Sequence, residues 1–205
     1  MESIWVTPER IARVTGALNE RMGSVVAVAE SVRRRHNVSA LLRTCEAFGV
    51  HEVHLVTAGF RASKGAARGA ERWVNRRTFG TVEGSIADLR GRGFAVYVAD
   101  IMPGAFTPES VPVDRPIAVI FGSEVRGVSE AGRGLADGAV FIPMRGLTES
   151  LNVSVSASII LRTIIDRRRA LVGPDLSEEA RAAFLAEWLE SEERAARGVL
   201  ARTEG

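Results

Sequence analysis

The chain alternates short, uninterrupted apolar runs with segments in which apolar residues recur every three or four positions. The apolar runs predict buried parallel strands, which cover residues 25–29, 51–56, 94–99, 117–121 and 139–142. The periodic segments predict helices, which cover residues 7–22, 37–49, 81–91, 129–135, 152–171 and a last segment after Ser177. Strands that alternate with helices indicate an α/β fold with a mainly parallel sheet.

Polar residues and glycines mark where these helices begin and end. Thr7 before Pro8 is typical of a helix start, because the threonine caps the first turn and the proline fixes its backbone. Ser177 takes the capping role at the last helix, and Gly173-Pro174 ends the helix before it. Residues 58–80 have weak periodicity and many basic and small residues, so we expect a functional loop with little regular structure there.

The order of the elements predicts one α/β domain, residues 25–172, with helical extensions at residues 1–24 and 173–205. Apolar residues make up 46% of the chain and charged residues 25%, which is ordinary for a globular protein. No apolar run reaches the roughly 18 residues that a membrane-spanning helix needs, and the first residues lack the pattern of a signal peptide. We therefore expect a cytoplasmic protein that does not enter a membrane.

The net charge of +2 conceals an uneven distribution. Residues 1–80 hold 13 Lys and Arg against 7 Asp and Glu, a balance of +6, so the remainder carries −4. Two basic clusters account for most of the excess: Arg33-Arg34-Arg35, and a longer one with Arg61, Lys64, Arg68, Arg72, Arg76 and Arg77. Such clusters suit the phosphate backbone of a nucleic acid, and a solvated loop surface is an equally good interpretation.

Several common kinds of site are missing from the sequence. The single cysteine, Cys45, excludes an internal disulfide and a cysteine-rich zinc site. The three histidines form no closely spaced ligand set, so no metal is expected, and His51 and His54 beside a predicted strand are interpreted as structural. Gly122–Gly127 has the glycine spacing of a P-loop, but Val128 stands where that motif needs a lysine, which excludes a P-loop NTPase.

The stretch Ile142–Ala157 joins the end of a predicted strand to the start of a long helix. Ser150, Asn152 and Ser154 lie together where that helix begins, although a helix start needs only one capping residue. Loops of this kind present free backbone amides, which is how α/β proteins build ligand sites at the ends of strands. We therefore expect a ligand site in this stretch.

Two further segments carry candidate site residues. In the first, Arg43 lies about 200° around a predicted helix from Leu41, so it points away from the apolar side and would face a ligand or solvent. Asn37, at the start of the same helix, would belong to a site or only cap the helix. In the second segment, Gly122 ends a buried strand and Glu124 follows in a turn, where its carboxylate would bind a ligand or cap a neighbouring helix.

Together and in this order, the three segments resemble the motifs of the SPOUT class of RNA methyltransferases, and in particular the TrmH family of tRNA 2′-O-methyltransferases. The three motifs read Asn37…Arg43-Thr44, then Phe121-Gly122-Ser123-Glu124…Gly127, then Ile142-Pro143-Met144…Ser150-Leu151-Asn152-Val153-Ser154. The resemblance covers roughly residues 25–172, and the helical C-terminal extension is also similar to that family.

The resemblance implies a parallel α/β core whose C-terminal part forms a deep trefoil knot, and a homodimer whose site is completed across the interface. It implies S-adenosyl-L-methionine as the methyl donor, held largely by backbone groups near Ala99, Gly122, Ile142 and Leu151. The implied substrate is tRNA, and the implied reaction methylates the ribose 2′-hydroxyl of the D-loop guanosine at position 18.

The resemblance also assigns the chemistry to Arg43, Asn37, Ser150, Asn152 and Glu124. Arg43 would activate the ribose hydroxyl by clamping a tRNA phosphate that helps to accept the proton, because a guanidinium is normally never a base. Asn37, Ser150 and Asn152 would orient Arg43 and the hydroxyl, and Glu124 matches a family position at the RNA site on the dimer side. Within the basic clusters, Arg33, Arg34, Arg35, Arg61, Lys64, Arg68 and Arg72 would contact the RNA.

Two other functions compete with this prediction. A ribosomal RNA 2′-O-methyltransferase would share the motifs, and it is disfavoured because many such enzymes carry a separate N-terminal RNA-binding domain, whereas only about 24 residues precede the first predicted strand here. A non-catalytic RNA-binding module with the same fold is disfavoured, because Asn37, Arg43, Glu124, Ser150 and Asn152 are all intact.

Overall fold

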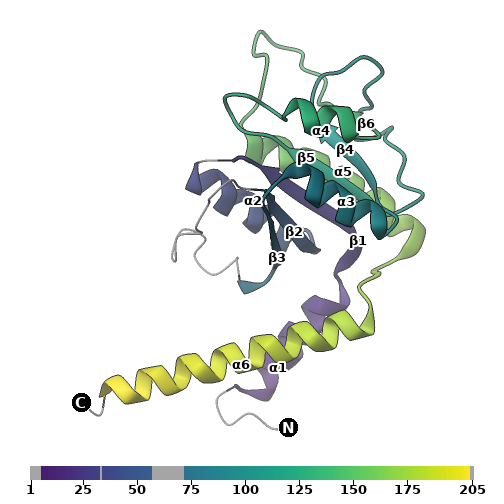
Figure 1. Cartoon of the computed structure of the whole chain (residues 1–205). Coiled ribbons are helices and arrows are strands. Elements are labelled where there is room, and N and C mark those ends of the chain that lie inside the picture. Colours follow the sequence, from purple (N-terminus) through teal and green to yellow (C-terminus); the bar gives the residue numbers. More distant parts are fainter. Residues whose placement is uncertain (1–5, 33, 57–71, 204–205) are drawn as a thin grey trace. The chain divides into compact units, whose positions relative to one another are not determined.

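The computed structural model describes residues 6–32, 34–56 and 72–203 (Figure 1). Contacts between residues divide the chain into two compact units, Met22–Asp175 and a smaller unit that combines Met1–Arg21 with Leu176–Gly205. No helix in the described part of the chain is long and apolar enough to cross a membrane.

A six-stranded sheet forms the centre of the larger unit, and every pair of neighbouring strands is parallel. The strands are β1 (Met22–Glu30), β2 (Val50–Val56), β3 (Asn75–Phe79), β4 (Ala95–Ala99), β5 (Ile117–Phe121) and β6 (Gly138–Val140). They lie in the order β3-β2-β1-β5-β4-β6. The predicted α/β class with a parallel sheet is therefore confirmed, whereas the trefoil knot stays a prediction.

Helices cover both faces of this sheet (Figure 1). On one face, α2 (Arg35–Ala47) and α5 (Val153–Val172) pack over an apolar core that includes Val25 and Ala27. On the other face, α3 (Val82–Gly91) contributes to a second core with Val26 and Val28, beside the short α4 (Glu130–Leu135). Because the middle of β1 is buried on both sides, its residues 25–29 form an uninterrupted apolar run instead of an alternating one.

The capping residues proposed for the first and last helices act as caps in the structure. The Thr7 hydroxyl accepts a hydrogen bond from the Arg10 amide at 3.3 Å, and Ser177 accepts one from the Ala180 amide at 3.1 Å. Gly173 ends α5 with a φ of 70°, a left-handed conformation that favours glycine. One expectation is wrong: α2 begins at Arg35, so Asn37 lies inside the first turn and neither starts nor caps the helix.

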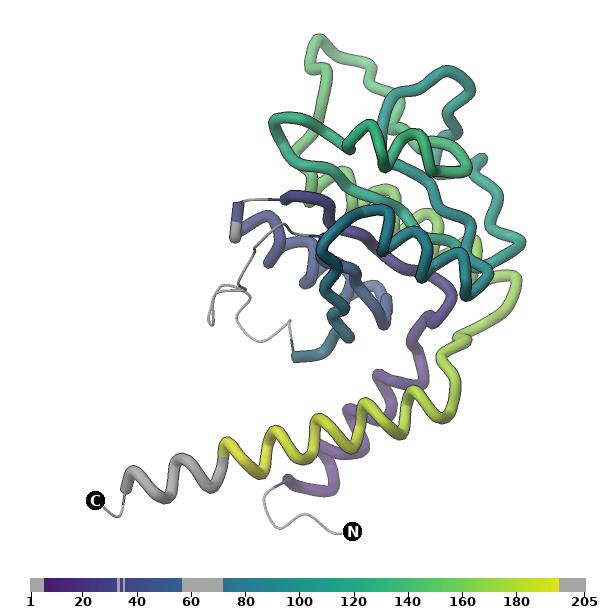
Figure 2. Tube along the Cα trace, in the orientation of Figure 1, coloured from purple at the N-terminus to yellow at the C-terminus, as the bar shows by residue number. Residues whose placement is uncertain are grey.

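The smaller unit consists of two helices, α1 (Pro8–Asn19) and α6 (Glu178–Thr203), which lie side by side in Figures 1 and 2. Trp188 of α6 is 3% exposed, and the guanidinium of Arg10 lies 5.8 Å from the centre of its ring. Arg10 also forms an ion pair of 3.1 Å with Glu192. Apolar burial and one cation–π contact therefore hold α6 to α1.

The expectation of a loop with little regular structure at residues 58–80 is wrong where the chain forms β3. This strand lies at the edge of the sheet and pairs only with β2. Its residues alternate between half-buried and exposed, and Phe79 is its single apolar side chain. Without an apolar run, the sequence pattern did not indicate a strand. Residues 57–71 lie outside the described part of the chain.

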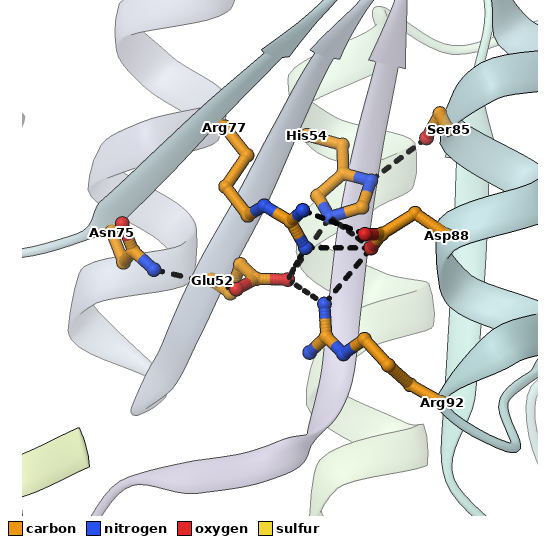
Figure 3. A network of polar contacts seen from close by, with 7 residues as sticks. All are labelled: Glu52, His54, Asn75, Arg77, Ser85, Asp88 and Arg92. Atoms are coloured by element: carbon orange, nitrogen blue, oxygen red, sulfur yellow. Dashed lines mark hydrogen bonds and ion pairs between the residues drawn. The ribbon is translucent and has the colours of Figure 1, made fainter.

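A buried polar network joins β2 and β3 to α3 (Figure 3), beside the apolar cluster that contains Val56, Ile86 and Leu89. The ring of His54 has no exposed surface, and its nitrogens lie 2.8 Å from the Ser85 hydroxyl and 2.9 Å from the Glu52 carboxylate. Arg77 donates two hydrogen bonds of 2.6 Å to Asp88, and Arg92 donates one of 2.5 Å to Glu52. The network therefore attaches the edge strand to the sheet, as expected of a structural histidine.

The same geometry argues against two other roles for this network. Ser85, His54 and Glu52 are connected like a hydrolase triad, but Ser85 and His54 are fully buried and cannot meet a substrate. Glu52, His54 and Asp88 present ligand atoms within 4.8 Å of one another, as a metal site would. However, two guanidinium groups already neutralise both carboxylates, so a further cation would be repelled.

Protonation states follow from these contacts. Burial raises the pKa of Glu52, but the hydrogen bonds and charges of His54 and Arg92 outweigh burial and hold that pKa below its usual value. The two hydrogen bonds from Arg77 likewise lower the pKa of Asp88. Both carboxylates therefore stabilise the folded state in their charged form.

We expect Glu52→Gln to lower the free energy of unfolding at neutral pH by about 2 kcal/mol, because the charged partners of the carboxylate remain half-buried. Since the folded pKa of Glu52 is depressed, its contribution is present above about pH 4 and is lost as the pH falls through the folded pKa. Denaturant unfolding of wild type and variant should therefore give a difference that shrinks in acid. Glu109→Gln changes an exposed carboxylate and is the control. A difference that does not depend on pH would contradict this role of Glu52.

Candidate functional site

Loops that follow β4, β5 and β6 meet at the carboxyl edge of the sheet and line a cavity of about 590 Å³. Parallel strands place their carboxyl ends along one edge, where α/β proteins bind ligands. The volume is typical of small-molecule sites. The four residues expected near the methyl donor all line this cavity: Ala99, Gly122, Ile142 and Leu151.

The loop after β5 folds back tightly on itself beside the cavity. Ser123 and Gly127 exchange two backbone hydrogen bonds of 3.1 and 2.9 Å, and the Ser123 hydroxyl accepts a third from the Arg126 amide at 3.2 Å. A Cβ on Gly122 would lie 2.0 Å from the carbonyl carbon of Gly127. Only glycine therefore permits the two backbone segments to approach so closely.

Three of the predicted catalytic residues form one hydrogen-bonded chain at the cavity wall. Asn37, which is 2% exposed, donates from its side-chain amide to the Glu124 carboxylate. Its carbonyl oxygen accepts a bond of 3.2 Å from Asn152. The carbonyl oxygen of Asn152 in turn accepts bonds from the amide and hydroxyl of Ser154 at 2.9 and 2.6 Å, so Asn152 caps α5. Ser150 lines the same cavity.

Arg43 does not join this group. It is exposed and lines a second hollow of about 530 Å³ on the face formed by α2 and α5, together with Phe48 and Val155. Arg43 lies six positions after Asn37, which places the two side chains about 120° apart around the helix. Asn37 can therefore face the cavity while Arg43 faces the second hollow.

Only some of the predicted RNA-binding residues can be located in the structure. Arg34 lines the main cavity from the residue before α2, and Arg72 is exposed just before β3. Of the other residues predicted to contact RNA, Arg33, Arg61, Lys64 and Arg68 lie outside the described residues, as does the side chain of Arg35.

The structure adds two acidic residues that the sequence interpretation did not single out. Asp100 lines the cavity directly after β4 and pairs with Arg133 at 2.6 Å. Glu30, 5% exposed at the end of β1, accepts a hydrogen bond of 3.0 Å from the Ser129 amide, and so holds the start of α4. Both residues could have been identified from the sequence, because each is a carboxylate directly after an apolar run that predicts a buried strand.

The chemistry available at the cavity is that of binding and orientation. Its walls combine apolar side chains such as Phe121 and Ile142 with amide and carboxylate groups. None of the described residues that line it is a histidine or a lysine, so Ser150 lacks the usual base that turns a serine into a covalent nucleophile. The cavity is therefore better suited to binding and orienting molecules than to forming a covalent intermediate on Ser150.

Comparison with protein families and known proteins gives consistent matches. Residues 24–162 match the model of the SpoU rRNA Methylase family. The chain is 39% identical over 189 residues to the tRNA (guanosine(18)-2′-O)-methyltransferase of Thermus thermophilus, covering 89% of this chain and 97% of that protein.

Solved structures show the same likeness. The TrmH/SpoU tRNA modifying enzyme of Aquifex aeolicus is similar with a TM-score of 0.81 and 30% identity, covering 90% of this chain and 96% of that one. The SpoU methyltransferase AviRb of Streptomyces viridochromogenes, solved in complex with AdoMet, has a TM-score of 0.63. It covers 74% of this chain and 62% of that one at 19% identity, so it shares the fold.

We expect Gly122→Ala to lower the free energy of unfolding by about 1–3 kcal/mol, because the added methyl group meets the backbone of Gly127. Gly134→Ala is the matched control in α4, since no atom lies within 4 Å of its Cβ position. It should leave stability unchanged or raise it slightly, because alanine favours the helix. Denaturant unfolding measures both changes, and equal stabilities of the two variants would contradict the close approach.

Proposed function

This chain belongs to the SpoU rRNA Methylase family, and we propose that it is a tRNA (guanosine-2′-O-)-methyltransferase that uses S-adenosyl-L-methionine. The proposed target is the D-loop guanosine at position 18, as named for the Thermus thermophilus relative. The proposal rests on the cavity at the carboxyl edge, where Asn37, Glu124 and Asn152 form one hydrogen-bonded chain beside the expected donor contacts. An enzyme acting on tRNA would work in the cytoplasm.

The cavity has the size and the character that S-adenosyl-L-methionine requires. Its walls offer apolar surface from Phe121, Ile142 and Leu151, together with the backbone groups of three loops. When bound, the donor supplies a methyl group on a sulfonium, whose carbon–sulfur bond breaks during transfer. The loops near Ala99 and Gly122 would hold the donor so that its methyl group faces Asn37 and Asn152.

The reaction forms a bond between the ribose 2′-oxygen and the methyl carbon, and it requires the hydroxyl proton to leave that oxygen. Ser150 and Asn152 would orient the hydroxyl, and the hydrogen bond from Asn152 to Asn37 keeps both amides in place. Arg43 would clamp a tRNA phosphate that accepts the proton, because a guanidinium stays charged and matches phosphate oxygens in pairs.

Arg43 does not line the cavity of its own chain, and a second copy of the chain would bring its Arg43 to that cavity. In a single chain it lines the second hollow, on a face where Val155 and Ile159 remain 45% and 39% exposed. We therefore propose a homodimer in which the α2 and α5 faces of two copies pack together. Such a symmetric interface would bury these aliphatic side chains and complete each site with the Arg43 side chain of the opposite copy.

The direct test is to incubate the purified protein with labelled methyl donor and either unmodified tRNA or ribosomal RNA, and to map the modified nucleotide. We expect a 2′-O-methylated guanosine at position 18 of tRNA. Methylation of ribosomal RNA alone would support the competing ribosomal enzyme. RNA binding without transfer to either substrate would identify a non-catalytic RNA-binding module.

Arg43→Ala should lower kcat for tRNA by about 100-fold or more, because the phosphate that accepts the proton loses its clamp. Binding of the methyl donor should be unchanged, since Arg43 lies outside the donor cavity. Arg115→Ala removes an arginine before β5, at the opposite edge of the sheet, and is the control for charge. Near-normal turnover of Arg43→Ala would refute its role.

Mixing two inactive variants separates a dimer-completed site from a single-chain site. Arg43→Ala and Asn152→Ala are each expected to be inactive alone. Mixed at equal amounts after subunit exchange, half of the dimers are hybrid and one of their two sites is intact, so about a quarter of the wild-type rate should return. If Arg43 acts within its own chain, no activity returns.

A further inference from the structure

Many arginines of the larger unit have partners within the fold. Arg77 and Arg92 bind Asp88 and Glu52, and Arg133 binds Asp100 at 2.6 Å. Arg168 is 7% exposed and donates to the Val113 carbonyl. These guanidinium groups stabilise the structure, so little of their charge is available to a partner molecule.

Three arginines that line the main cavity or directly follow its lining residues differ from these. Arg34 lines the cavity, and Arg126 and Arg145 directly follow the lining residues Val125 and Met144. All three are exposed, and within the described residues none of their side chains makes a hydrogen bond or an ion pair. They come from three separate segments, namely the start of α2, the loop after β5 and the loop after β6.

The acidic groups at the same mouth compensate only part of this positive charge. Asp100 is paired with Arg133, whereas Glu124 accepts its hydrogen bond from the neutral amide of Asn37, which leaves the carboxylate charge in place. Glu149 is exposed in the same loop as Arg145 and is the third carboxylate among the described lining residues. Three guanidinium groups therefore stand against two carboxylates without a cationic partner, and the remaining positive charge favours an anionic partner.

Exposed aliphatic side chains occur in the loops around the same cavity. Ile101, Val125 and Leu147 are 72%, 88% and 103% exposed, and the first two line the cavity. Leu147 lies two residues after Arg145 in the loop after β6. A surface that combines guanidinium groups with protruding aliphatic groups matches a strand of RNA, which offers phosphates beside apolar base faces.

We propose that Arg34, Arg126 and Arg145 form a cationic rim that binds the phosphates on either side of the target nucleotide, with Leu147 against a neighbouring base. This inference rests on the proposed function, because it takes RNA as the substrate of the cavity. Guanidinium forks bind phosphate oxygens in pairs. Phosphate contacts position RNA without reading its sequence, so the rim holds the ribose over the cavity and leaves base selection to other groups.

The test measures binding of an unmodified tRNA transcript as a function of salt concentration. Arg126→Gln and Arg145→Gln should each weaken binding about threefold to tenfold at physiological salt and reduce the slope of log affinity against log salt by about one. The double variant should reduce the slope by about two. Arg115→Gln is the matched control, because it removes a 57% exposed arginine that precedes β5 at the opposite edge of the sheet.

Leu147→Ser provides the complementary measurement. It should weaken tRNA binding about threefold while leaving the salt slope unchanged, because it removes apolar contact and no charge. Donor binding should match the wild type in every variant, which shows that the cavity itself is intact.

Two results would contradict the proposal that these arginines form an RNA-binding rim. The first is a salt slope for the arginine variants equal to that of Arg115→Gln. The second is a change of oligomeric state on Leu147→Ser in sedimentation, which would make the rim a contact between copies of the chain. Failure of the proposed function has a different signature, since the wild type would then transfer no methyl group to tRNA, whatever the salt slopes show.

Discussion

The arrangement of the site depends on the two hydrogen bonds that the side chain of Asn37 makes. It is almost fully buried, and it links α2 to Glu124 after β5 and to Asn152 at the start of α5. A buried amide that loses a partner costs about 1–3 kcal/mol, so these three segments keep one relative position. The polar wall of the cavity is therefore organised before any ligand arrives, which lowers the cost of orienting reactants.

Different interactions stabilise the strands beside the site and the strand at the far edge of the sheet. The central strands β1 and β5 are buried on both faces, and the loops around the cavity extend from a dry, closely packed core. The edge strand β3 pairs only with β2 and places a single apolar side chain, Phe79, against a core. It is held in addition by the ion pairs of Arg77 with Asp88 and of Arg92 with Glu52. Apolar packing thus dominates around the strands next to the site, whereas polar contacts contribute more at the edge strand farthest from the site.

Local patterns were sufficient to predict most of this fold, because buried strands and helix caps leave their signal within a few residues. Thr7, Ser177 and Gly173 could be placed from sequence for that reason. The strand β3 was missed, since its stability comes from contacts to other elements rather than from its own apolar residues.

The grouping of Asn37, Glu124 and Asn152 followed from family resemblance, and their hydrogen bonds needed coordinates. Bonds between residues 87 and 115 positions apart leave no local trace in the sequence. The helical rotation between Asn37 and Arg43 could be calculated from their spacing. However, that Arg43 would face a separate hollow depends on how α2 packs against α5.

The position of Arg43 on that other face has a consequence for the proposed dimer. Because each active site would need two chains, the fraction of working sites would depend on the concentration of the protein. Dilution would deplete working sites without unfolding any chain, so activity per molecule would rise with the abundance of the protein.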